Sequence, residues 1–218
     1  MNYLIIENVL PPDLLLEITN AISQGPFDNG KSTANGLAKT AKKNLQLSAA
    51  AHGELLHKIG QVIESNAMVR SFALPHKISR LILNRYEKEM DYGLHSDGAY
   101  IDDVRTDISF TLFLDDPSTY EGGELVIATA SQQFTFKLPA GRMVIYPTGA
   151  LHRVTPVTHG VRNALVGWIQ SRIKDAAKRE IIAKLNLVPN TLSSDEKYRE
   201  LATLTGECIQ NLVRMWGE

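Results

Sequence analysis

A dense series of short β-rich runs between residues 77 and 171 constrains the fold more than any other feature of the sequence. Turn signals such as EGGE and PAGR separate these runs, which are KISRLILNRY, DISFTLFL, GELVIA, QFTFKL, RMVIY, HRVTPV and ALVGWIQ. Short strands at close spacing, without helices between them, are typical of a β-sandwich or jelly roll and not of an alternating α/β sheet. We therefore expect a mainly β core.

Helices are expected before this core. Residues 3–9 favour a first strand, and the Pro-Pro-Asp sequence at 11–13 begins a helix that ends at Gly25. Residues 46–70 carry apolar side chains at roughly helical spacing, which predicts a second helical stretch.

Between these helical segments, residues 25–44 show little periodicity and are rich in Gly, Asn, Ser and Lys. So long a loop is uncommon inside a domain unless it covers a binding site, so it is either a lid or a solvated surface loop. If this loop closes over a site, its net positive charge favours an anionic partner. Its one acidic residue is Asp28, and its basic residues are Lys31, Lys39, Lys42 and Lys43.

The chain becomes helical again after Arg172. Apolar side chains at helical spacing predict helices over 172–186 and 195–216, joined by the turn LVPNTLSS. The expected fold class is thus mainly β with flanking helices (α+β): a β core, N-terminal helices and a C-terminal helical hairpin. The hairpin either packs on the core or offers a surface for a homo-oligomer.

Composition excludes several classes of partner. A length of 218 residues fits one domain with a small helical appendage, and a net charge of -1 gives no electrostatic reason to bind nucleic acid or an anionic membrane. The single cysteine, Cys208, allows no intrachain disulfide, which suits a reducing compartment. Without an apolar run of membrane-spanning length or a basic leader, we expect a cytoplasmic protein.

His95, Asp97 and His152 are the candidate metal ligands and catalytic residues. In a strand, side chains two positions apart share a face, so His95 and Asp97 can reach one ion, and His152 follows at a loop-to-strand junction in TGALHRV. Two imidazoles and one carboxylate leave three coordination positions open on iron(II). Zinc accepts the same ligands, so the ligand set alone does not choose the metal.

Arg162, ten positions after His152, is the candidate anion-binding residue. A tight turn around His159 and Gly160 is expected to place it on the strand beside the one that bears His152. A buried guanidinium needs an anionic partner, because an unpaired charge in a core is very costly. That partner is either a dicarboxylate ligand or an internal carboxylate such as Glu121 or Glu124.

The chain resembles the bacterial PKHD-type (prolyl/lysyl hydroxylase-domain) oxygenases, within the wider 2-oxoglutarate/iron(II) dioxygenase group. The resemblance covers nearly the whole chain and rests on NRY at 84–86, Tyr92, HSDG at 95–98, RTDISFTLFL at 105–114, YEGGEL at 120–125, LPAG at 138–141, YP at 146–147, LHRVTPVTHGVR at 151–162 and WIQS at 168–171.

This resemblance implies a double-stranded β-helix (a cupin-like jelly roll) over about 77–171, inside an oxygenase domain of residues 1–171, with 172–218 as a helical extension. It further implies that iron(II) binds at His95, Asp97 and His152 and that Arg162 binds the C5 carboxylate of 2-oxoglutarate.

The resemblance also suggests which residues line the co-substrate pocket. Tyr86 matches a tyrosine that faces the pocket in similar hydroxylases, although a buried core tyrosine is the alternative. Trp168 either lines the pocket or is a structural core residue. Leu165 stands where similar enzymes often carry a small hydroxyl residue, which weakens the case for a second hydrogen bond to the C5 carboxylate.

Strand alternation in DISFTLFL adds one further residue. Ile108, Phe110, Leu112 and Leu114 form a uniformly apolar face that should meet the helices. The opposite face, with Thr111, should point into the barrel, where Thr111 can touch the co-substrate.

The expected function is hydroxylation of a prolyl- or lysyl-type peptide or a small molecule, with oxygen as the oxidant, release of succinate and carbon dioxide, and ascorbate as reductant. Two alternatives stay open. One is a zinc hydrolase with the same ligands, which leaves Arg162 unexplained. The other is a jelly-roll module without catalysis that senses iron or 2-oxoglutarate or binds a partner.

Overall fold

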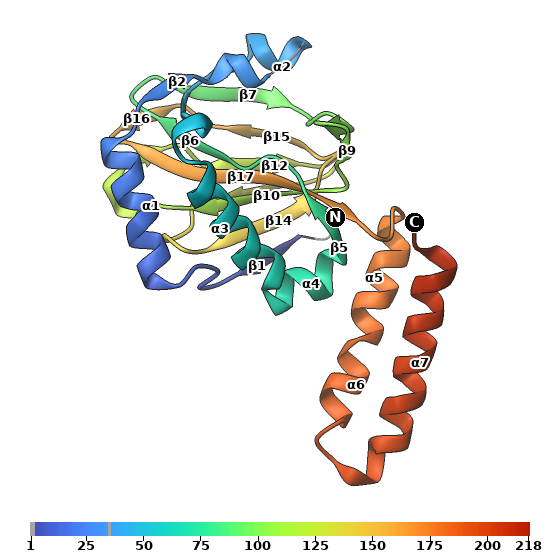
Figure 1. The fold of residues 1–218 in the computed structure, drawn as a ribbon. Coiled ribbons are helices and arrows are strands. Elements are labelled where there is room, and N and C mark those ends of the chain that lie inside the picture. Colours follow the sequence, from blue (N-terminus) through green and yellow to red (C-terminus); the bar gives the residue numbers. More distant parts are fainter. Residues whose placement is uncertain (1–2, 35) are drawn as a thin grey trace.

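Two antiparallel sheets form the centre of the molecule in the computed structural model, which describes residues 3–34 and 36–218 (Figure 1). The larger sheet has eight strands. Along its path lie β1 (Leu4–Ile6), β14 (Met143–Pro147), β10 (Ile108–Phe113), β17 (Arg162–Ser171), β6 (Ile82–Tyr86), β4 (Leu45–Leu47) and β2 (Phe27–Asn29), with β5 (Pro75–Ile78) beside β17.

The smaller, five-stranded sheet faces the larger one. It runs in the order β13 (Gln133–Phe136), β12 (Leu125–Ala128), β15 (Leu151–Val154), β7 (Asp91–His95) and β3 (Lys42–Lys43). Phe113, Val144 and Tyr146 of the larger sheet pack against Leu125, Ile127 and Phe136 of the smaller one. This is the jelly-roll (double-stranded β-helix) core that the sequence predicted. Two short ribbons complete it: β8 (Tyr100–Ile101) with β9 (Val104–Arg105), and β11 (Glu121–Gly122) with β16 (Val157–His159).

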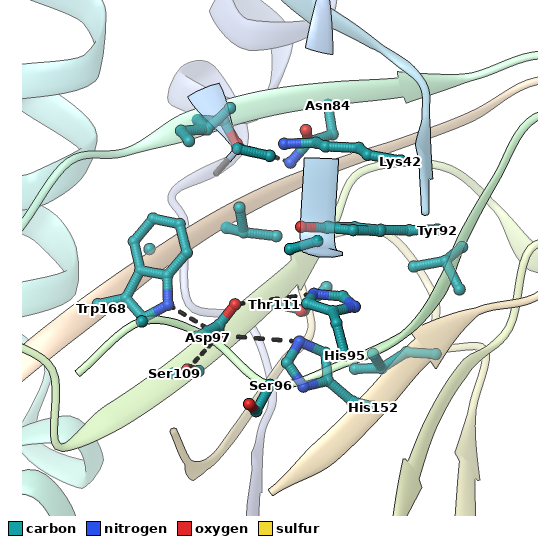
Figure 2. A pocket seen from close by; sticks show the side chains of 18 of the residues that line it. Lys42, Asn84, Tyr92, His95, Ser96, Asp97, Ser109, Thr111, His152 and Trp168 are labelled. Carbon is teal, nitrogen blue, oxygen red and sulfur yellow. Dashed lines mark hydrogen bonds and ion pairs between the residues drawn. The ribbon is translucent and has the colours of Figure 1, made fainter. Parts of the chain in front are cut away.

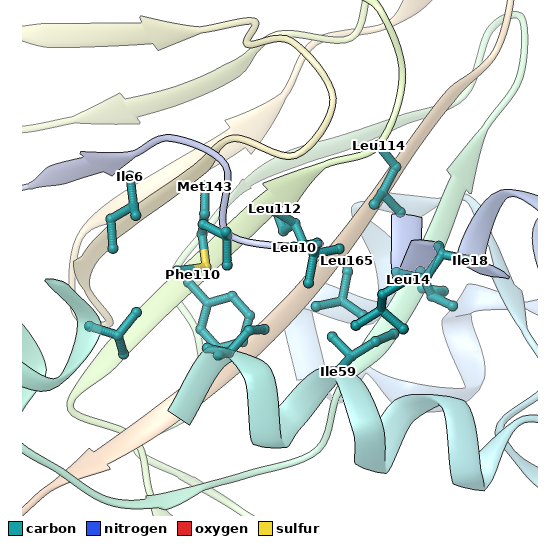
Figure 3. Packing of buried hydrophobic residues seen from close by; sticks show 14 of the residues in the cluster. Ile6, Leu10, Leu14, Ile18, Ile59, Phe110, Leu112, Leu114, Met143 and Leu165 are labelled. Atoms are coloured by element: carbon teal, nitrogen blue, oxygen red, sulfur yellow. The ribbon is translucent and has the colours of Figure 1, made fainter. Parts of the chain in front are cut away.

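Three helices cover the outer face of the larger sheet: α1 (Pro12–Gln24), α3 (Gly53–Ser65) and α4 (Ala67–Ala73). Leu14 and Ile18 of α1 and Ile59 of α3 are buried against the apolar face of β10 (Figure 3). That face comprises Ile108, Phe110, Leu112 and Leu114, so the predicted orientation of this strand is confirmed.

The predictions for residues 25–47 were partly wrong. In place of one long loop, the chain forms β2, a 3-10 turn (Gly30–Thr33), α2 (Gly36–Thr40) and β3. Residues 45–47, assigned in part to a helical stretch, form β4, and regular helix begins only at Gly53. Elements of two to five residues are too short for hydrophobic periodicity to identify, and their pairing partners are distant in sequence.

The C-terminal region forms the predicted helical hairpin, which projects away from the sheets (Figure 1). Its helices are α5 (Ala176–Leu185), α6 (Leu187–Leu192) and α7 (Arg199–Trp216), so the predicted turn is itself largely helical. Pro189 is tolerated because it lies in the first turn of α6, where backbone N–H groups have no acceptor within the helix. Within the described residues, no helix is long and apolar enough to cross a membrane.

Candidate metal centre and its cavity

The three predicted metal ligands converge on one point. His95 ends β7 and lies opposite His152 of the neighbouring strand β15, while Asp97 follows two residues after His95. One ligand atom from each residue lies within 4.8 Å of the others. The Asp97 oxygens are 3.8 Å from Nε2 of His95 and 3.7 Å from Nε2 of His152 (Figure 2). A single ion between these atoms would receive two nitrogens and one oxygen.

Backbone carbonyl groups fix the orientation of both imidazoles. Nδ1 of His95 lies 2.7 Å from the carbonyl oxygen of Gly93, and Nδ1 of His152 lies 3.0 Å from that of Ala150. A ring whose Nδ1–H donates to a carbonyl presents a free lone pair at Nε2, which faces Asp97 in both residues. Burial, together with the neighbouring His152, lowers the pKa of His95 to about 4, so its imidazole is neutral at neutral pH.

Asp97 is held by two donors from the larger sheet. The Ser109 hydroxyl and the indole Nε1–H of Trp168 each donate to Oδ2 of Asp97, both at 2.8 Å. Thr148 Oγ1 lies 3.0 Å from Ser109 Oγ. Trp168 therefore combines its two predicted roles, because it lines the cavity and is also a structural partner of the carboxylate. The roles of Ser109 and Thr148 were not predicted.

Arg162 lies in the sheet opposite His152, so its predicted position on the neighbouring strand was wrong. The turn at Gly160, which has a φ of 73°, does reverse the chain. However, β16 separates from β15 to pair with β11, and Arg162 begins β17 in the larger sheet, in register with Tyr86 of β6. A turn fixes the change of direction but not the sheet that the next strand joins. Arg162 therefore lies across the barrel from His152.

The Arg162 guanidinium is buried without an ion pair. Its side chain is 2% exposed, its Nε has no hydrogen-bond partner, and no carboxylate of the described residues lies within 4.0 Å. Its guanidinium carbon lies 5.1 Å and 5.5 Å from the ring centres of Tyr86 and Phe113. The alternative of an internal pair with Glu121 or Glu124 is therefore not observed. A cation in such surroundings has strong affinity for an anionic ligand.

One cavity of about 590 Å³ contains all of these groups. Tyr86 and Thr111 both line it, as predicted, and burial raises the pKa of the Tyr86 phenol to about 12. Burial also raises the pKa of Tyr146, and a hydrogen bond with Thr111 opposes this only in part. Leu165, by contrast, packs among the residues under the helices. A side chain three positions after Arg162 points to the other face of the strand, so the residue at 165 does not bear on this cavity.

The segment from 25 to 44 supplies one wall of the cavity, through Thr33, Ala34, Ala38 and Lys42. Lys42 is 5% exposed and lies near Tyr92, whose ring stacks on His95 with 3.6 Å between ring centres. The sequence drew attention to the lysines of this segment but gave no means of telling which one faces inward, because that depends on the pairing of β3 with β7.

The chain is similar to known proteins along its whole length. The profile of the 2OG-Fe(II) oxygenase superfamily matches residues 81–170. A PKHD-type hydroxylase of Picosynechococcus sp. is 41% identical over 215 residues, which cover 98% of each chain. The match includes the N-terminal helices and the C-terminal hairpin as well as the barrel.

Solved structures with little sequence identity share the fold. The prolyl-4-hydroxylase of Pseudomonas putida superimposes with a TM-score of 0.55 at 20% identity, over 78% of this chain and 92% of that chain. HygX of Streptomyces hygroscopicus, solved with nickel and 2-oxoglutarate bound, superimposes with a TM-score of 0.57 at 12% identity, over 78% of this chain and 84% of that chain.

Proposed function

Because the chain belongs to the PKHD-type hydroxylases of the 2OG-Fe(II) oxygenase superfamily, and is therefore a 2-oxoglutarate-dependent oxygenase, we propose that His95, Asp97 and His152 hold iron(II) and that Arg162 holds 2-oxoglutarate. The observation that carries this proposal is the meeting, in one cavity, of the three ligand atoms and a buried guanidinium that has no carboxylate partner and a free Nε donor. The reaction is hydroxylation of a substrate C–H bond, with release of succinate and carbon dioxide.

The residues fit an iron(II) ion. Two imidazoles and one carboxylate form a ligand set that iron(II) accepts, and both rings are already turned so that Nε2 faces Asp97. Ser109 and Trp168 each donate to the same Asp97 oxygen, which leaves Oδ1 for the ion. The bound metal, with 2-oxoglutarate and oxygen, supplies the oxidising power that no side chain possesses.

The co-substrate site fits a dicarboxylate. The planar guanidinium of Arg162 can hold the C5 carboxylate through two parallel hydrogen bonds, and its unpartnered Nε supplies a donor. Tyr86, in register with Arg162, and Thr111 place hydroxyl groups in the same cavity. We assign both to contact with 2-oxoglutarate. The aromatic rings beside Arg162 exclude water, which strengthens its attraction for the carboxylate.

We propose that the prime substrate is a prolyl- or lysyl-type peptide or a small molecule. Ascorbate would reduce the iron again after turnovers that consume 2-oxoglutarate without hydroxylating a substrate.

Exposed apolar residues on the hairpin, including Leu187, Leu201 and Leu204, support the proposal that two copies of the chain associate through α6 and α7.

The test is succinate formation from 2-oxoglutarate under air, with iron(II) and ascorbate, for the wild type, Asp97→Ala and the control Asp28→Ala. Asp28 is an exposed aspartate of β2. Metal content of each protein is measured in parallel. We expect the wild type and Asp28→Ala to bind iron and form succinate, and Asp97→Ala to do neither. If the wild type binds iron and 2-oxoglutarate but forms no succinate even with candidate substrates present, the sensor alternative replaces this proposal.

A further inference from the structure

Lys42 is a buried cation that the proposed function does not use. It lies on β3, in register with Tyr92 of β7, and lines the cavity that contains the metal ligands. Its Nζ is 5.2 Å from the centre of the Tyr92 ring. The His95 ring, which also belongs to β7, stacks on that tyrosine (Figure 2). Lys42 therefore borders the metal centre, whereas Arg162 lies beside Tyr86 and Phe113.

The ammonium group is incompletely paired by the protein. An ammonium has three N–H donors, and the acceptor found for Lys42 among the described residues is Thr33 Oγ1, at 3.1 Å. No carboxylate of those residues lies within 4.0 Å of it. Burial lowers the pKa of Lys42 to about 8, and attraction to Asp97 offsets this only in part. A buried ammonium whose contacts are one hydroxyl and the face of one aromatic ring keeps donors free, and this is costly unless a ligand completes its surroundings.

A buried polar network fixes the position of Lys42. Thr33 Oγ1, which accepts from Lys42, itself donates to Gln46 Oε1 at 2.9 Å. The amide groups of Gln46 and Asn44 then both donate to Asn84 Oδ1, at 3.0 Å and 2.7 Å. Asn84 and Gln46 are each 4% exposed. This network holds the ammonium at the cavity wall, so the side chain cannot readily turn outward into solvent.

The charges of the side chains around the cavity indicate which kind of ligand would pair with the Lys42 ammonium. Apart from the two histidines proposed to bind the metal, the charged side chains that line the cavity are Lys42, Asp97 and Arg162. Their sum is one positive charge. Iron(II) and the 2-oxoglutarate dianion cancel each other, so the loaded site keeps one positive charge, and Arg162 is then paired with the co-substrate. The remaining charge belongs to Lys42.

We propose that Lys42 binds a carboxylate of the prime substrate, which is therefore a small carboxylic acid whose reacting C–H bond lies near its acid group. This inference rests on the proposed function of the site. It favours a small acid over an internal peptide segment, because Lys42 is 5% exposed and a carboxylate must enter the cavity to reach it.

The test measures binding of matched acids and amides to protein loaded with manganese(II) in place of iron and with 2-oxoglutarate. The probes are propionate and benzoate against propionamide and benzamide, and the acetylated peptide Gly-Pro-Gly as its free acid and its amide. The signal is Trp168 fluorescence in a Trp216→Phe background, since Trp168 lines the cavity and the chain has two tryptophans. Lys42→Met, Lys42→Gln and Lys42→Arg are compared with Lys43→Met, an exposed neighbour on β3.

We expect the small acids to bind about tenfold more tightly than their amides, the difference of about 1.4 kcal/mol that one added ion pair supplies. Lys42→Met and Lys42→Gln should abolish this preference, and Lys42→Arg and Lys43→Met should keep it. Tighter binding of the tripeptide acid than of benzoate would replace the small acid with a peptide C-terminus and so overturn the substrate class.

Three further results overturn the assignment. One is that no acid binds or that acids and amides bind equally to the wild type. Another is that the preference survives in Lys42→Met, which would place the carboxylate on the metal. The last is that Lys42→Met weakens 2-oxoglutarate binding as much as Arg162→Leu does, which would place Lys42 in the co-substrate site. Failure of the wild type to bind 2-oxoglutarate is seen before any probe is added, and it counts against the proposed function instead.

Discussion

Asp97 illustrates how single residues prepare this site. Its carboxylate lies between two imidazoles, and both of its fixed donors, Ser109 and Trp168, come from the opposite sheet. A ligand held by hydrogen bonds on its other atoms needs little reorganisation when a metal binds, which raises metal affinity. Removing these donors should therefore weaken metal binding without removing a ligand.

Trp168→Phe removes the N–H donor to Asp97 and keeps an aromatic ring in its place. We expect the dissociation constant for manganese(II) to rise about 10- to 100-fold, the usual effect of losing a hydrogen bond to a metal ligand. Trp216→Phe, in the C-terminal helix α7, serves as the control and should bind manganese(II) as the wild type does. Equal affinities for the two variants would show that the Trp168 hydrogen bond does not support the metal centre.

The lowered pKa of His95 predicts a pH dependence of stability for the metal-free protein. Its pKa is about 4 in the folded protein and 6.5 as the ordinary value, so between these pH values the unfolded chain binds more protons. The stability that this neutral imidazole contributes is present above about pH 6.5 and is lost as the pH falls toward about 4, at up to about 1.4 kcal/mol per pH unit.

Urea unfolding at about pH 7 and about pH 5 measures this loss. The metal-free wild type should lose more free energy of unfolding between the two than His95→Gln, which has no proton to gain at this position. Identical losses for the two proteins would mean that other groups cause the pH dependence.

At the scale of elements, the strands divide their residues between two environments. On β17, Arg162, Val166 and Trp168 face the cavity, while Leu165 and Ile169 pack under the helices. The same alternation on β10 sends Thr111 inward and Leu112 outward. The helices therefore stabilise the larger sheet from outside and leave its inner face free for the site.

Helix α1 offers a matched pair for measuring this packing. Leu14 is 1% exposed and contacts the core under the sheet, whereas Leu16, two residues later, is 61% exposed. We expect Leu14→Ala to lower the free energy of unfolding by about 2–5 kcal/mol and Leu16→Ala by less than about 0.5 kcal/mol. Denaturant unfolding measures both, and similar costs for the two would contradict the packing of α1 on β10.

The turn before β17 positions Arg162 and requires glycine. Gly160 has a φ of 73°, and a Cβ there would overlap the carbonyl oxygen of Thr119. Gly160→Ala should cost about 1–2 kcal/mol of stability from its backbone conformation alone and should also weaken 2-oxoglutarate binding. Gly149→Ala, where the added Cβ meets nothing within 4 Å, is the control. The idea fails if calorimetric titration finds the same 2-oxoglutarate affinity for both variants.

On the scale of the whole molecule, the hairpin and the barrel differ in how they are stabilised. The hairpin contacts the rest of the chain near its base, where Ile173, Ile182 and Ile209 are buried together with part of Leu74. No residue of α6 is buried. Its outer end therefore depends on contacts within the hairpin, while β10 has neighbours on both edges and both faces.

Hydrogen exchange should reveal this difference. Amides of 187–205 should exchange through openings of low free energy, and those of Ile108–Phe113 only through openings close to global unfolding. If two copies associate through the hairpin, protection over 187–205 should rise with protein concentration. Mass spectrometry of the digested protein measures the protection of both regions. Equal protection of 187–205 and Ile108–Phe113 at every protein concentration would contradict both the weaker stability of the hairpin and the association of two copies.

The sequence alone determined the fold class and indicated the proposed metal ligands, because both inferences start from local patterns. Strand alternation fixes which side chains share a face, as in DISFTLFL, and the spacing of His95 and Asp97 follows from the same geometry. The residues themselves also indicated Arg162 as an anion-binding side chain, and the resemblance then assigned it to 2-oxoglutarate and added Tyr86. These inferences identified residues without arranging their strands in a sheet, and the one strand placement inferred from the sequence, that of Arg162, was wrong.

The tertiary structure alone decided what depends on strand pairing over long sequence separations. It placed Arg162 in the sheet opposite His152, brought Ser109 and Trp168 to Asp97, and folded Lys42 into the cavity wall. Each of these contacts joins segments that are distant in sequence. The alternation of apolar and polar residues in each segment is compatible with more than one partner strand. The choice among partners is made by the packing of the whole barrel, because the observed pairing buries the apolar faces of its strands together.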